Sequence, residues 1–430
     1  MTDPAASAHT DLAPRRAALD LLSAALSRRA GLDEAAGRAA FLALSPRDRG
    51  FARALVLATL RHLGPIDRAL DARLQKAPPD AVRNILRLGA AQTIALDTPA
   101  FAAVATSVDL AAALRETRPF KGLVNAVLRG VSREPPDLAD PEVFAPPWLF
   151  ARWAAAYGPE AARAIAATIP QEPATDLSLK DPGQTDHWAQ ALDAEVLAPG
   201  GLRTPLRGDL AAWPGYDEGA WWVQDASAAI PARLMDAGPG QTALDLCAAP
   251  GGKTLQLAAA GAATVAVDRS AARLKRVDEN LARLKLSAET VAADAADWVD
   301  ERTFDAVLLD APCSATGTFR RNPDVLWAAR PGDVAALAAV QSRLLDSAAR
   351  RTAVGGRLVY CVCSLEPEEG EAQAAAFLAR TPGFELEPAQ AGEAAAAEAS
   401  LRPDGTLRIL PHHRAGGTDG FYAARFRRRA

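Results

Sequence analysis

The carboxyl-terminal half of the chain alternates short apolar runs with amphipathic ones, and this alternation restricts the possible folds more than any other feature. From about Asp236 onward, strands are predicted at Ala243–Cys247, Thr264–Asp268, Glu289–Asp294, Phe304–Asp310 and Gly356–Cys361. Helical patterns lie between them at Thr254–Ala260, Ala271–Lys285 and Val334–Arg351. Alternating strands and helices favour a parallel sheet covered on both faces. We therefore expect a doubly wound α/β domain, with an antiparallel pair at the sheet edge formed by Leu407–Leu410 and Gly420–Phe426.

A glycine turn and several acidic residues stand where the first predicted strands end. The segment Asp245–Thr254 (DLCAAPGGKT) passes from strand to helix, and its glycines let a ligand approach a helix amino terminus. It matches neither the P-loop nor the glycine pattern of dinucleotide folds. Asp268 ends the second strand, where it can accept ribose hydroxyls, and Asp294 ends the third, where it can meet an adenine edge.

No basic cluster is placed to meet a pyrophosphate, so the pattern favours an adenosine cofactor without one, such as S-adenosylmethionine. The candidate cofactor-binding residues are Cys247, Ala248, Ala249, Pro250, Gly251, Gly252, Lys253, Asp268, Arg273, Asp294 and Asp310.

Two cysteines follow predicted strands: Cys313 in Asp310–Ser314 (DAPCS) and Cys363 in Tyr360–Ser364 (YCVCS). Ligands bind at the carboxyl ends of strands in an open parallel sheet, so we expect the two thiols to meet at one reaction site. A thiol nucleophile beside a nucleotide cofactor is the resulting hypothesis, and the spacing leaves open which thiol attacks. Cys361 is expected in the core, facing away from Cys363.

The cysteine count excludes other roles. Four cysteines with none in the first 246 residues do not make a disulfide framework. The thiol of Cys247, like that of Cys361, is expected in the core. No His/Cys cluster has zinc spacing, so no metal site is expected.

The amino-terminal third, from residue 14 to about residue 131, is predicted to be helical throughout. Ser45–Asp48 (SPRD) is a typical helix start, with a serine cap and proline at the first position. A second helix opens at Pro78–Asp80, and others are predicted near Ala100–Arg115 and Gly122–Val131. Short connections favour a compact bundle.

Domain boundaries follow from composition. Proline and aspartate are frequent at 134–147, which marks a boundary, and 171–223 mixes short β-like runs with turns, as in a small α+β insert. The expected domains are a helical domain at 1–135, a connector with the insert at 136–235, and the α/β domain at 236–430.

Charge is distributed unevenly along the chain. Residues 1–135 hold 19 Lys and Arg against 13 Asp and Glu, a balance of +6, although the whole chain carries −4. A basic module on an acidic body suggests a polyanion-binding domain, although solvated helix faces would explain the arginines equally well. No stretch approaches the roughly 20 apolar residues that span a bilayer, and the first 30 residues lack a signal-peptide core. A cytoplasmic protein without membrane contact is expected.

Several motifs together resemble the cytosine-5 RNA methyltransferases of the Nol/Nop/Sun family. The segments that carry the resemblance are Asp245–Thr254, Asp310–Thr318 and Tyr360–Glu369, with Val223–Ser227, Arg320–Asp324 and Asp419–Ala423 as further matches. The amino-terminal third resembles the RNA-binding NusB fold at Ile85–Gln92 and Phe120–Arg129. A NusB-like domain joined to a Sun-type domain is the architecture of bacterial 16S ribosomal RNA methyltransferases. The resemblance thus implies an all-α bundle, the insert, and a class I, Rossmann-like methyltransferase domain.

The resemblance also implies a reaction. A methyl group passes from S-adenosylmethionine to carbon 5 of a cytosine in 16S rRNA, through a cysteine adduct at carbon 6. By analogy with the RNA family, Cys363 is the nucleophile and Cys313 assists product release. Asp310 is the expected partner of the cytosine edge or of the cofactor amino group. The implied partner is 16S rRNA or a small-subunit particle, and the implied enzyme is a monomer.

Two departures from the family pattern and two alternative functions remain at this level. Ala315 replaces the usual glycine, which costs little unless the backbone there has positive φ. Asp176–Lys180 (DLSLK) replaces a family segment, which puts RNA contacts by the insert in doubt. The alternatives are an RNA-binding assembly or antitermination factor with an inactive methyltransferase domain, and a transfer RNA cytosine-5 methyltransferase.

Overall fold

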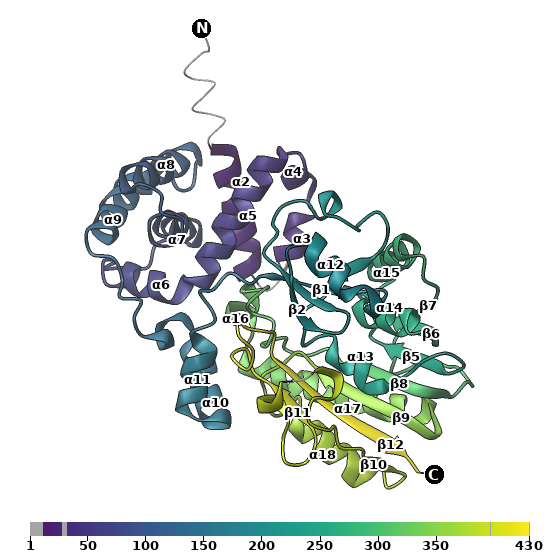
Figure 1. Cartoon of the computed structure of the whole chain (residues 1–430). Coiled ribbons are helices and arrows are strands. Elements are labelled where there is room, and N and C mark those ends of the chain that lie inside the picture. The colour runs from purple at the N-terminus through teal and green to yellow at the C-terminus, as the bar shows by residue number, and fades with distance from the viewer. Residues whose placement is uncertain (1–11, 28–31, 396, 430) are drawn as a thin grey trace. The chain divides into compact units, whose positions relative to one another are not determined.

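The computed structural model describes residues 12–27, 32–395 and 397–429, and the chain divides into two compact units (Figure 1). The first unit comprises the chain up to Gln171 together with Asn322–Ala328. The second comprises Glu172–Arg321 and the chain from Ala329 onward.

The first unit is built from helices around one apolar core. Its α-helices are α2 (Leu12–Leu26), α3 (Leu32–Ala36), α4 (Ala39–Leu42), α5 (Pro46–Arg61), α6 (Leu63–Asp71), α7 (Asp80–Ile94), α8 (Ala100–Ala113), α9 (Lys121–Arg133), α10 (Pro147–Tyr157), α11 (Pro159–Ala166) and α16 (Asp324–Ala328). Ser45 Oγ accepts a hydrogen bond from the Asp48 amide at 3.1 Å, so the predicted cap of α5 is present. Leu22, Leu55 and Ile85 lie in the shared core. The helical bundle predicted from the sequence is confirmed.

Helix α16 joins this unit from a distant part of the sequence. The indole Nε1 of Trp327 donates to the Leu60 carbonyl at 2.9 Å, and the Trp327 ring packs against the helical core. Sequence reasoning placed this segment within the α/β range 236–430.

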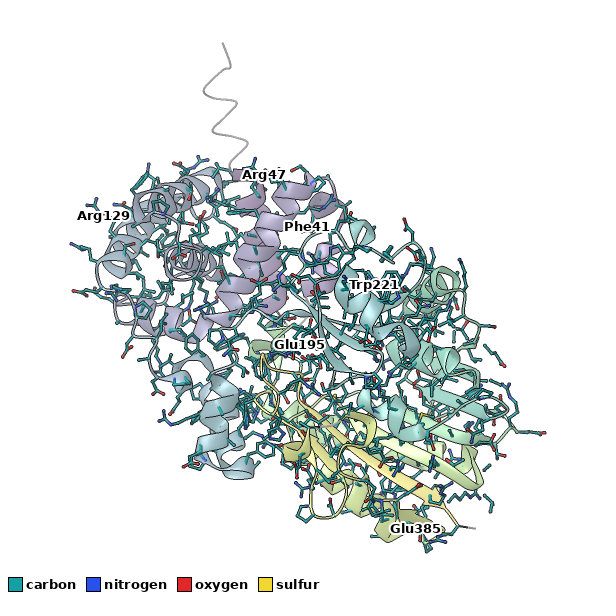
Figure 2. All side chains as sticks on the ribbon, viewed as in Figure 1. Phe41, Arg47, Arg129, Glu195, Trp221 and Glu385 are labelled. Atoms are coloured by element: carbon teal, nitrogen blue, oxygen red, sulfur yellow. The ribbon has the colours of Figure 1, made fainter. Side chains whose placement is uncertain are left out.

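The second unit begins with a small antiparallel sheet. Its strands are β1 (Thr175–Leu179), β2 (Glu195–Ala198), β3 (Gly201–Thr204) and β4 (Trp221–Val223), in the order β2-β3-β1-β4. Helix α12 (Thr185–Ala191) packs on it through Trp188, and Trp221 (labelled in Figure 2) is fully buried in the same core. The α+β insert predicted from the sequence is present, and these tryptophans serve its core.

The unusual segment Asp176–Lys180 has structural roles. Asp176 forms a buried ion pair with Arg203 at 2.7 Å, and Lys180 Nζ donates to the Leu284 carbonyl at 2.9 Å. These side chains therefore anchor the insert within its own unit.

The main sheet has the order β10-β12-β9-β8-β5-β6-β7, with β11 paired to β12. The strands are β5 (Thr242–Leu246), β6 (Ala263–Asp268), β7 (Glu289–Ala292), β8 (Phe304–Asp310), β9 (Thr352–Val362), β10 (Phe384–Leu386), β11 (Leu407–Ile409) and β12 (Phe421–Arg428). Strands β5 to β9 pair in parallel, whereas β12 is antiparallel to β9, β10 and β11. The other α-helices of this unit are α13 (Ile230–Met235), α14 (Gly252–Ala259), α15 (Ala271–Leu284), α17 (Pro331–Arg351) and α18 (Glu371–Arg380).

Both faces of this sheet are buried. In β8, Val307 and Leu309 join the apolar cluster that contains Leu345 of α17, whereas Ala306 and Leu308 join the cluster that contains Leu234 of α13. Successive side chains of a strand alternate between faces, and burial on both faces explains why the strands read as uninterrupted apolar runs. The doubly wound sheet predicted from the sequence is confirmed.

One local prediction, the end of the third strand, was wrong. Strand β7 ends at Ala292, so Asp294 lies in the loop that follows. The antiparallel pair of β11 and β12 predicted at the sheet edge is present, and β10 pairs with β12 at the same edge. Strand β10 has only three residues, which is too short for an alternating pattern to be recognised. Among the described residues, no helix is long and apolar enough to cross a membrane.

Candidate active site

The thiols of Cys313 and Cys363 lie together beyond the carboxyl ends of the adjacent parallel strands β8 and β9. Their Sγ atoms are 3.5 Å apart. Strand β8 ends at Asp310 and β9 at Val362, so each cysteine stands in the loop just after its strand. The two residues that sequence reasoning selected from separate motifs therefore occupy one place.

Backbone contacts hold the two loops in this position. The Gly317 amide donates to the Cys363 carbonyl at 3.0 Å, and the Gly420 amide donates to the Gly317 carbonyl at 2.8 Å. A Cβ atom at Gly317 would lie 2.1 Å from the Gly420 oxygen, so this approach requires glycine. Ala315 has φ +56°, the left-handed conformation in which alanine is strained.

A buried carboxylate also connects the two loops. Glu369, fully buried, accepts hydrogen bonds from the Ser314 amide at 2.9 Å and from Ser364 Oγ at 2.5 Å. The Ser314 hydroxyl and Gln341 Nε2, the latter at 3.1 Å, also donate to it. Sequence reasoning placed Glu369 in a family motif but gave it no role. An acid five residues after Ser364 was the available signal.

The two other cysteines differ in exposure, because Cys361 is buried whereas Cys247 is half-buried. Cys361 is buried, and its Sγ lies 3.4 Å from Asp310 Oδ1. Burial and the charge of Asp310 raise the pKa of this thiol. The expectation that Cys361 faces away from Cys363 was wrong, because residues two apart in a strand share a face and both pack with the same cluster. Burial likewise raises the pKa of Cys247.

The Cys313 thiol is held in its protonated form. Its hydrogen bond with Cys363 and its burial raise the pKa of Cys313 well above the usual value, and the negative charge of Glu369 raises it further.

A lysine–aspartate pair lines a cavity beside Cys363. Lys253 Nζ lies 2.7 Å from Asp310 Oδ2 and 5.3 Å from the centroid of the Phe421 ring. Burial lowers the pKa of Lys253, but the charge and hydrogen bond of Asp310 together with the other nearby acidic groups outweigh burial, so the pKa lies above its usual value. The cavity has a volume of about 360 Å³, and Lys253, Asp310, Phe421, Cys363 and Arg321 are among its lining residues.

Three of the recognised motif segments meet at this cavity. Arg321 forms an ion pair with the buried Asp419, and Thr418 Oγ1 donates to Asp225 Oδ1 at 3.1 Å. Burial raises the pKa of Asp419 to about 6, although Arg321 opposes that rise. These segments carried part of the family resemblance, but the sequence alone did not predict these contacts.

The predicted cofactor turn connects β5 to α14. Gly251 has φ +105°, which favours glycine. Asp268 is 2% exposed and accepts the Ala249 amide at 3.1 Å and the Ser270 amide at 2.9 Å. Arg273 contacts Asp268 at 3.4 Å and donates to the Ala249 carbonyl. Asp268 and Arg273 thus hold the turn in place from the second strand.

The turn and its surroundings fit S-adenosylmethionine chemically. A sulfonium cation with an amino group and ribose hydroxyls calls for acceptors. Asp268 and Asp310 are the last residues of β6 and β8, and the exposed Asp294 lies in the loop after β7. One buried acceptor, Asp245 Oδ1, has no hydrogen-bond partner. Among the described residues, no group of three His, Cys, Asp or Glu side chains could hold a metal ion.

A doubly wound sheet with a glycine turn after its first strand and acids at the next strand ends defines an S-adenosylmethionine-dependent methyltransferase. Comparison with known proteins specifies the family. Residues 232–427 match the family described as 16S rRNA methyltransferase RsmB/F, and residues 12–133 match the NusB family.

Whole-chain relatives agree. The chain is 39% identical over 438 residues to ribosomal RNA small subunit methyltransferase B of Pseudomonas putida, covering 96% of this chain and 98% of that protein. It is 38% identical over 439 residues to the enzyme of the same name from Pseudomonas syringae pv. tomato, covering 96% of each. The crystal structure of PH0851 has the same fold, with a TM-score of 0.77, 23% identity, and coverage of 95% of this chain and 98% of that one. The chain therefore belongs to the RsmB/F family of S-adenosylmethionine-dependent RNA cytosine-5 methyltransferases, with an amino-terminal NusB domain.

Proposed function

We propose that the protein methylates carbon 5 of a cytosine in 16S rRNA through a covalent bond between Cys363 and carbon 6 of the base. The observation that carries this proposal is the pair of thiols 3.5 Å apart, one of which, Cys363, lines a cavity together with Lys253 and Asp310. The description of the matched family, which names 16S rRNA, and the names of the whole-chain relatives, which name small-subunit ribosomal RNA, support 16S rRNA as the substrate. The intact thiols weigh against an inactive assembly factor.

The chemistry requires a nucleophile because carbon 5 of cytosine is itself a poor one. Attack of the Cys363 thiolate on carbon 6 forms a C–S bond and places electron density on carbon 5. S-adenosylmethionine supplies the methyl group when bound. After transfer, a base removes the carbon 5 proton, the C–S bond breaks, and the electron pair returns to the Cys363 sulfur. The Lys253–Asp310 pair borders the same cavity and can hold the edge of the base.

Cys313 acts in product release. Its sulfur lies within 3.5 Å of the Cys363 sulfur, which must leave carbon 6. Because the raised pKa keeps Cys313 protonated, its S–H can form a hydrogen bond to the departing sulfur.

The remaining assignments follow from position. The turn from Cys247 to Lys253, with Asp268, Arg273, Asp294 and Asp310, would hold the cofactor. Residues 1–135 would bind RNA, and 236–430 would catalyse methyl transfer. Residues 136–235 would link these two domains and face the RNA. We place the enzyme in the cytoplasm as a monomer that acts on 16S rRNA or on a small-subunit particle.

The test is a denaturing-gel assay of Cys313→Ala with 16S rRNA and S-adenosylmethionine. A slowly migrating RNA–protein band is expected, because the adduct forms but does not break down. The double variant Cys313→Ala/Cys363→Ala is the matched control and should give no band. If Cys363→Ala accumulates the band instead, the two roles are reversed. If transfer RNA but not 16S rRNA is methylated and trapped, the assigned substrate is wrong.

A further inference from the structure

Arg233 is a half-buried cation without a partner. It lies in α13, and no acceptor within the described part of the chain is in hydrogen-bonding distance of its guanidinium group. By contrast, the buried side chains of Arg203, Arg408 and Arg425 in the same unit each form an ion pair with a carboxylate. Charges withdrawn from water are ordinarily paired, so the position of Arg233 suggests a partner that is not part of the chain.

A second arginine adds to the positive charge near Arg233. Arg414 donates to the carbonyl groups of Leu197 at 3.4 Å and Ala395 at 3.1 Å, and neither acceptor carries a formal charge. Both arginines lie at the β2–β3 hairpin, because a Cβ atom added at Gly201 would be 3.3 Å from Arg233 Nη2. Burial and the charge of Arg414 lower the pKa of Arg233. Positive charge therefore gathers here without a neutralising acid.

A cavity of about 290 Å³ borders Arg233. It lies between the insert, α13 and α14, and it is far larger than one water molecule needs. Ser178 and Lys180 of the insert border the same cavity. Successive side chains of a strand alternate between its faces. Because Leu177 and Leu179 face the core of the insert, Ser178 lies on the opposite face, on the side of the cavity.

Three polar side chains at this cavity have unused hydrogen-bond donors. Lys180 Nζ uses one of its three N–H groups on a backbone carbonyl. Ser178 is 4% exposed, and its hydroxyl has no partner among the described residues, as is also true of the Arg233 guanidinium. Asp236 borders the cavity as well, but its Oδ2 pairs with Arg357 at 2.9 Å. Free donors and uncompensated positive charge together favour an anionic ligand.

We propose that Arg233, Lys180 and Ser178 bind a backbone phosphate of the substrate RNA. Phosphate oxygens accept charge-assisted hydrogen bonds from arginine and lysine. Trp222 borders both this cavity and the cavity of Cys363, so the phosphate belongs to the strand near the target nucleotide. The inference rests on the proposed function, in which the target cytosine enters the Cys363 cavity. The insert then contacts RNA through the segment that departs from the family pattern.

The first experiment measures binding of 16S rRNA to the full-length protein by filter binding across a salt series. Arg233→Gln should weaken binding about tenfold. The slope of log affinity against log salt should fall by roughly 0.7–0.9, as expected for one lost phosphate contact. The free energy of unfolding in urea should not fall, because Arg233 makes no hydrogen bond or ion pair within the described chain. Lower stability with unchanged RNA affinity would identify a structural arginine and overturn the proposal.

Arg380→Gln is the matched control. It removes the same charge from the same unit, at a side chain that is 32% exposed, pairs with Asp346 at 2.9 Å and borders neither cavity. Its affinity for RNA should equal that of the wild type, and equal losses in the two variants would assign the effect to net charge and contradict the proposal.

Ser178→Ala is a second variant that leaves the charge unchanged. It should weaken RNA binding about threefold through the lost hydroxyl and keep the salt dependence. If Arg233→Gln does not fold, unchanged RNA affinity in Ser178→Ala would reject the site.

Inorganic phosphate tests the site without RNA. Phosphate, compared with chloride at equal ionic strength, should raise the Tm of the wild type and of Arg380→Gln more than that of Arg233→Gln. Equal shifts in all three proteins would refute an anion site at Arg233, whatever RNA adduct Cys313→Ala forms. A shift that depends on Arg233, with unchanged RNA affinity in Arg233→Gln, would make free phosphate the ligand and overturn the assignment to RNA. The same shift without any RNA adduct in Cys313→Ala would contradict the proposed function and leave the anion site standing.

Discussion

Ala315 carries backbone strain in the loop between Cys313 and Gly317. Its φ of +56° lies in the left-handed region, where a non-glycine residue costs about 1–2 kcal/mol. Ala315→Gly should raise the free energy of unfolding by about 1 kcal/mol, because relief of strain exceeds the added entropy of the unfolded chain. Urea unfolding of both proteins measures the difference.

The control for this prediction is the same substitution in ordinary helical backbone. Ala375 is exposed within α18, where glycine should lower the free energy of unfolding by about 1 kcal/mol. If both variants are destabilised alike, the strain at Ala315 is not real.

Asp245 should make stability depend on pH. The side chain is fully buried, and burial raises its pKa to about 7, although Thr254 donates to it at 2.6 Å. Between about pH 4 and pH 7 the folded protein therefore holds a proton that the unfolded chain releases, so this contribution to stability falls as pH rises. Asp245→Asn should remove a decrease on the order of 3 kcal/mol between pH 5 and pH 8. Urea unfolding at the two pH values gives the slope.

Asp297→Asn is the reference for this measurement. Asp297 is an exposed residue in the connection between β7 and β8. Its substitution should leave the pH dependence of the free energy of unfolding as in the wild type. If the free energy of unfolding changed equally with pH in Asp245→Asn and in Asp297→Asn, the buried proton would not belong to Asp245.

The sequence predicted single site residues better than their contacts. Cys313, Cys363 and Asp310 follow apolar runs directly, so sheet topology alone brings them together. Asp268 was correctly placed at a strand end, but the sequence did not show that the Ala249 and Ser270 amides bind its oxygens. Such contacts depend on which loops meet, and no periodicity encodes that.

At the scale of elements, the predictable strands were those with both faces buried. Strands β5, β8 and β9 are apolar runs that are almost entirely buried, so the sequence indicated them clearly. Strand β10 is short and paired on one side only, so its residues carry little pattern. The role of Glu369 was missed for a related reason, since it joins two loops through side-chain contacts rather than through an element.

Gly317 joins β12 to the two cysteine loops, and its substitution tests that junction. A Cβ at this position would lie 2.1 Å from the Gly420 oxygen, which is backbone and cannot rotate away. Gly317→Ala should lower the free energy of unfolding by about 2 kcal/mol or more and should reduce methyl transfer, because the loop of Cys363 must shift. Urea unfolding and a methyl-transfer assay measure the two effects.

Gly332→Ala separates this effect from the general effect of glycine replacement. Gly332 lies in α17, and a Cβ added there would have no atom within 4 Å, so alanine should stabilise by up to about 1 kcal/mol. Wild-type activity in Gly317→Ala would show that the junction does not position Cys363.

For the whole molecule, sequence order and spatial unit differ at one segment. Residues Asn322–Ala328 belong to the helical unit, although both flanking segments belong to the other. The contacts of Trp327 with Leu60 and the helical core show its place. A linear reading of domains cannot find such a segment, because it assigns every residue by its neighbours along the chain.

The excess positive charge of the helical unit should act on RNA through exposed cations of α9. Lys121 and Arg129 are both exposed there, and Arg129 lies at the surface of its unit (Figure 2). Lys121→Glu/Arg129→Glu in the full-length protein should weaken binding to 16S rRNA and flatten its salt dependence. The slope of log affinity against log salt should fall by roughly 1.5, because two phosphate contacts no longer release counterions. Filter binding across a salt series measures both.

The matched control is Arg343→Glu/Arg350→Glu, which makes the same charge change at exposed positions of α17 in the other unit. If attraction to RNA followed net charge alone, both double variants would lose affinity equally. A local electrostatic grip instead requires the α9 variant to lose more affinity and more salt dependence than the α17 variant. Equal losses would therefore assign RNA binding to the overall charge of the chain and would remove the special role of the helical unit.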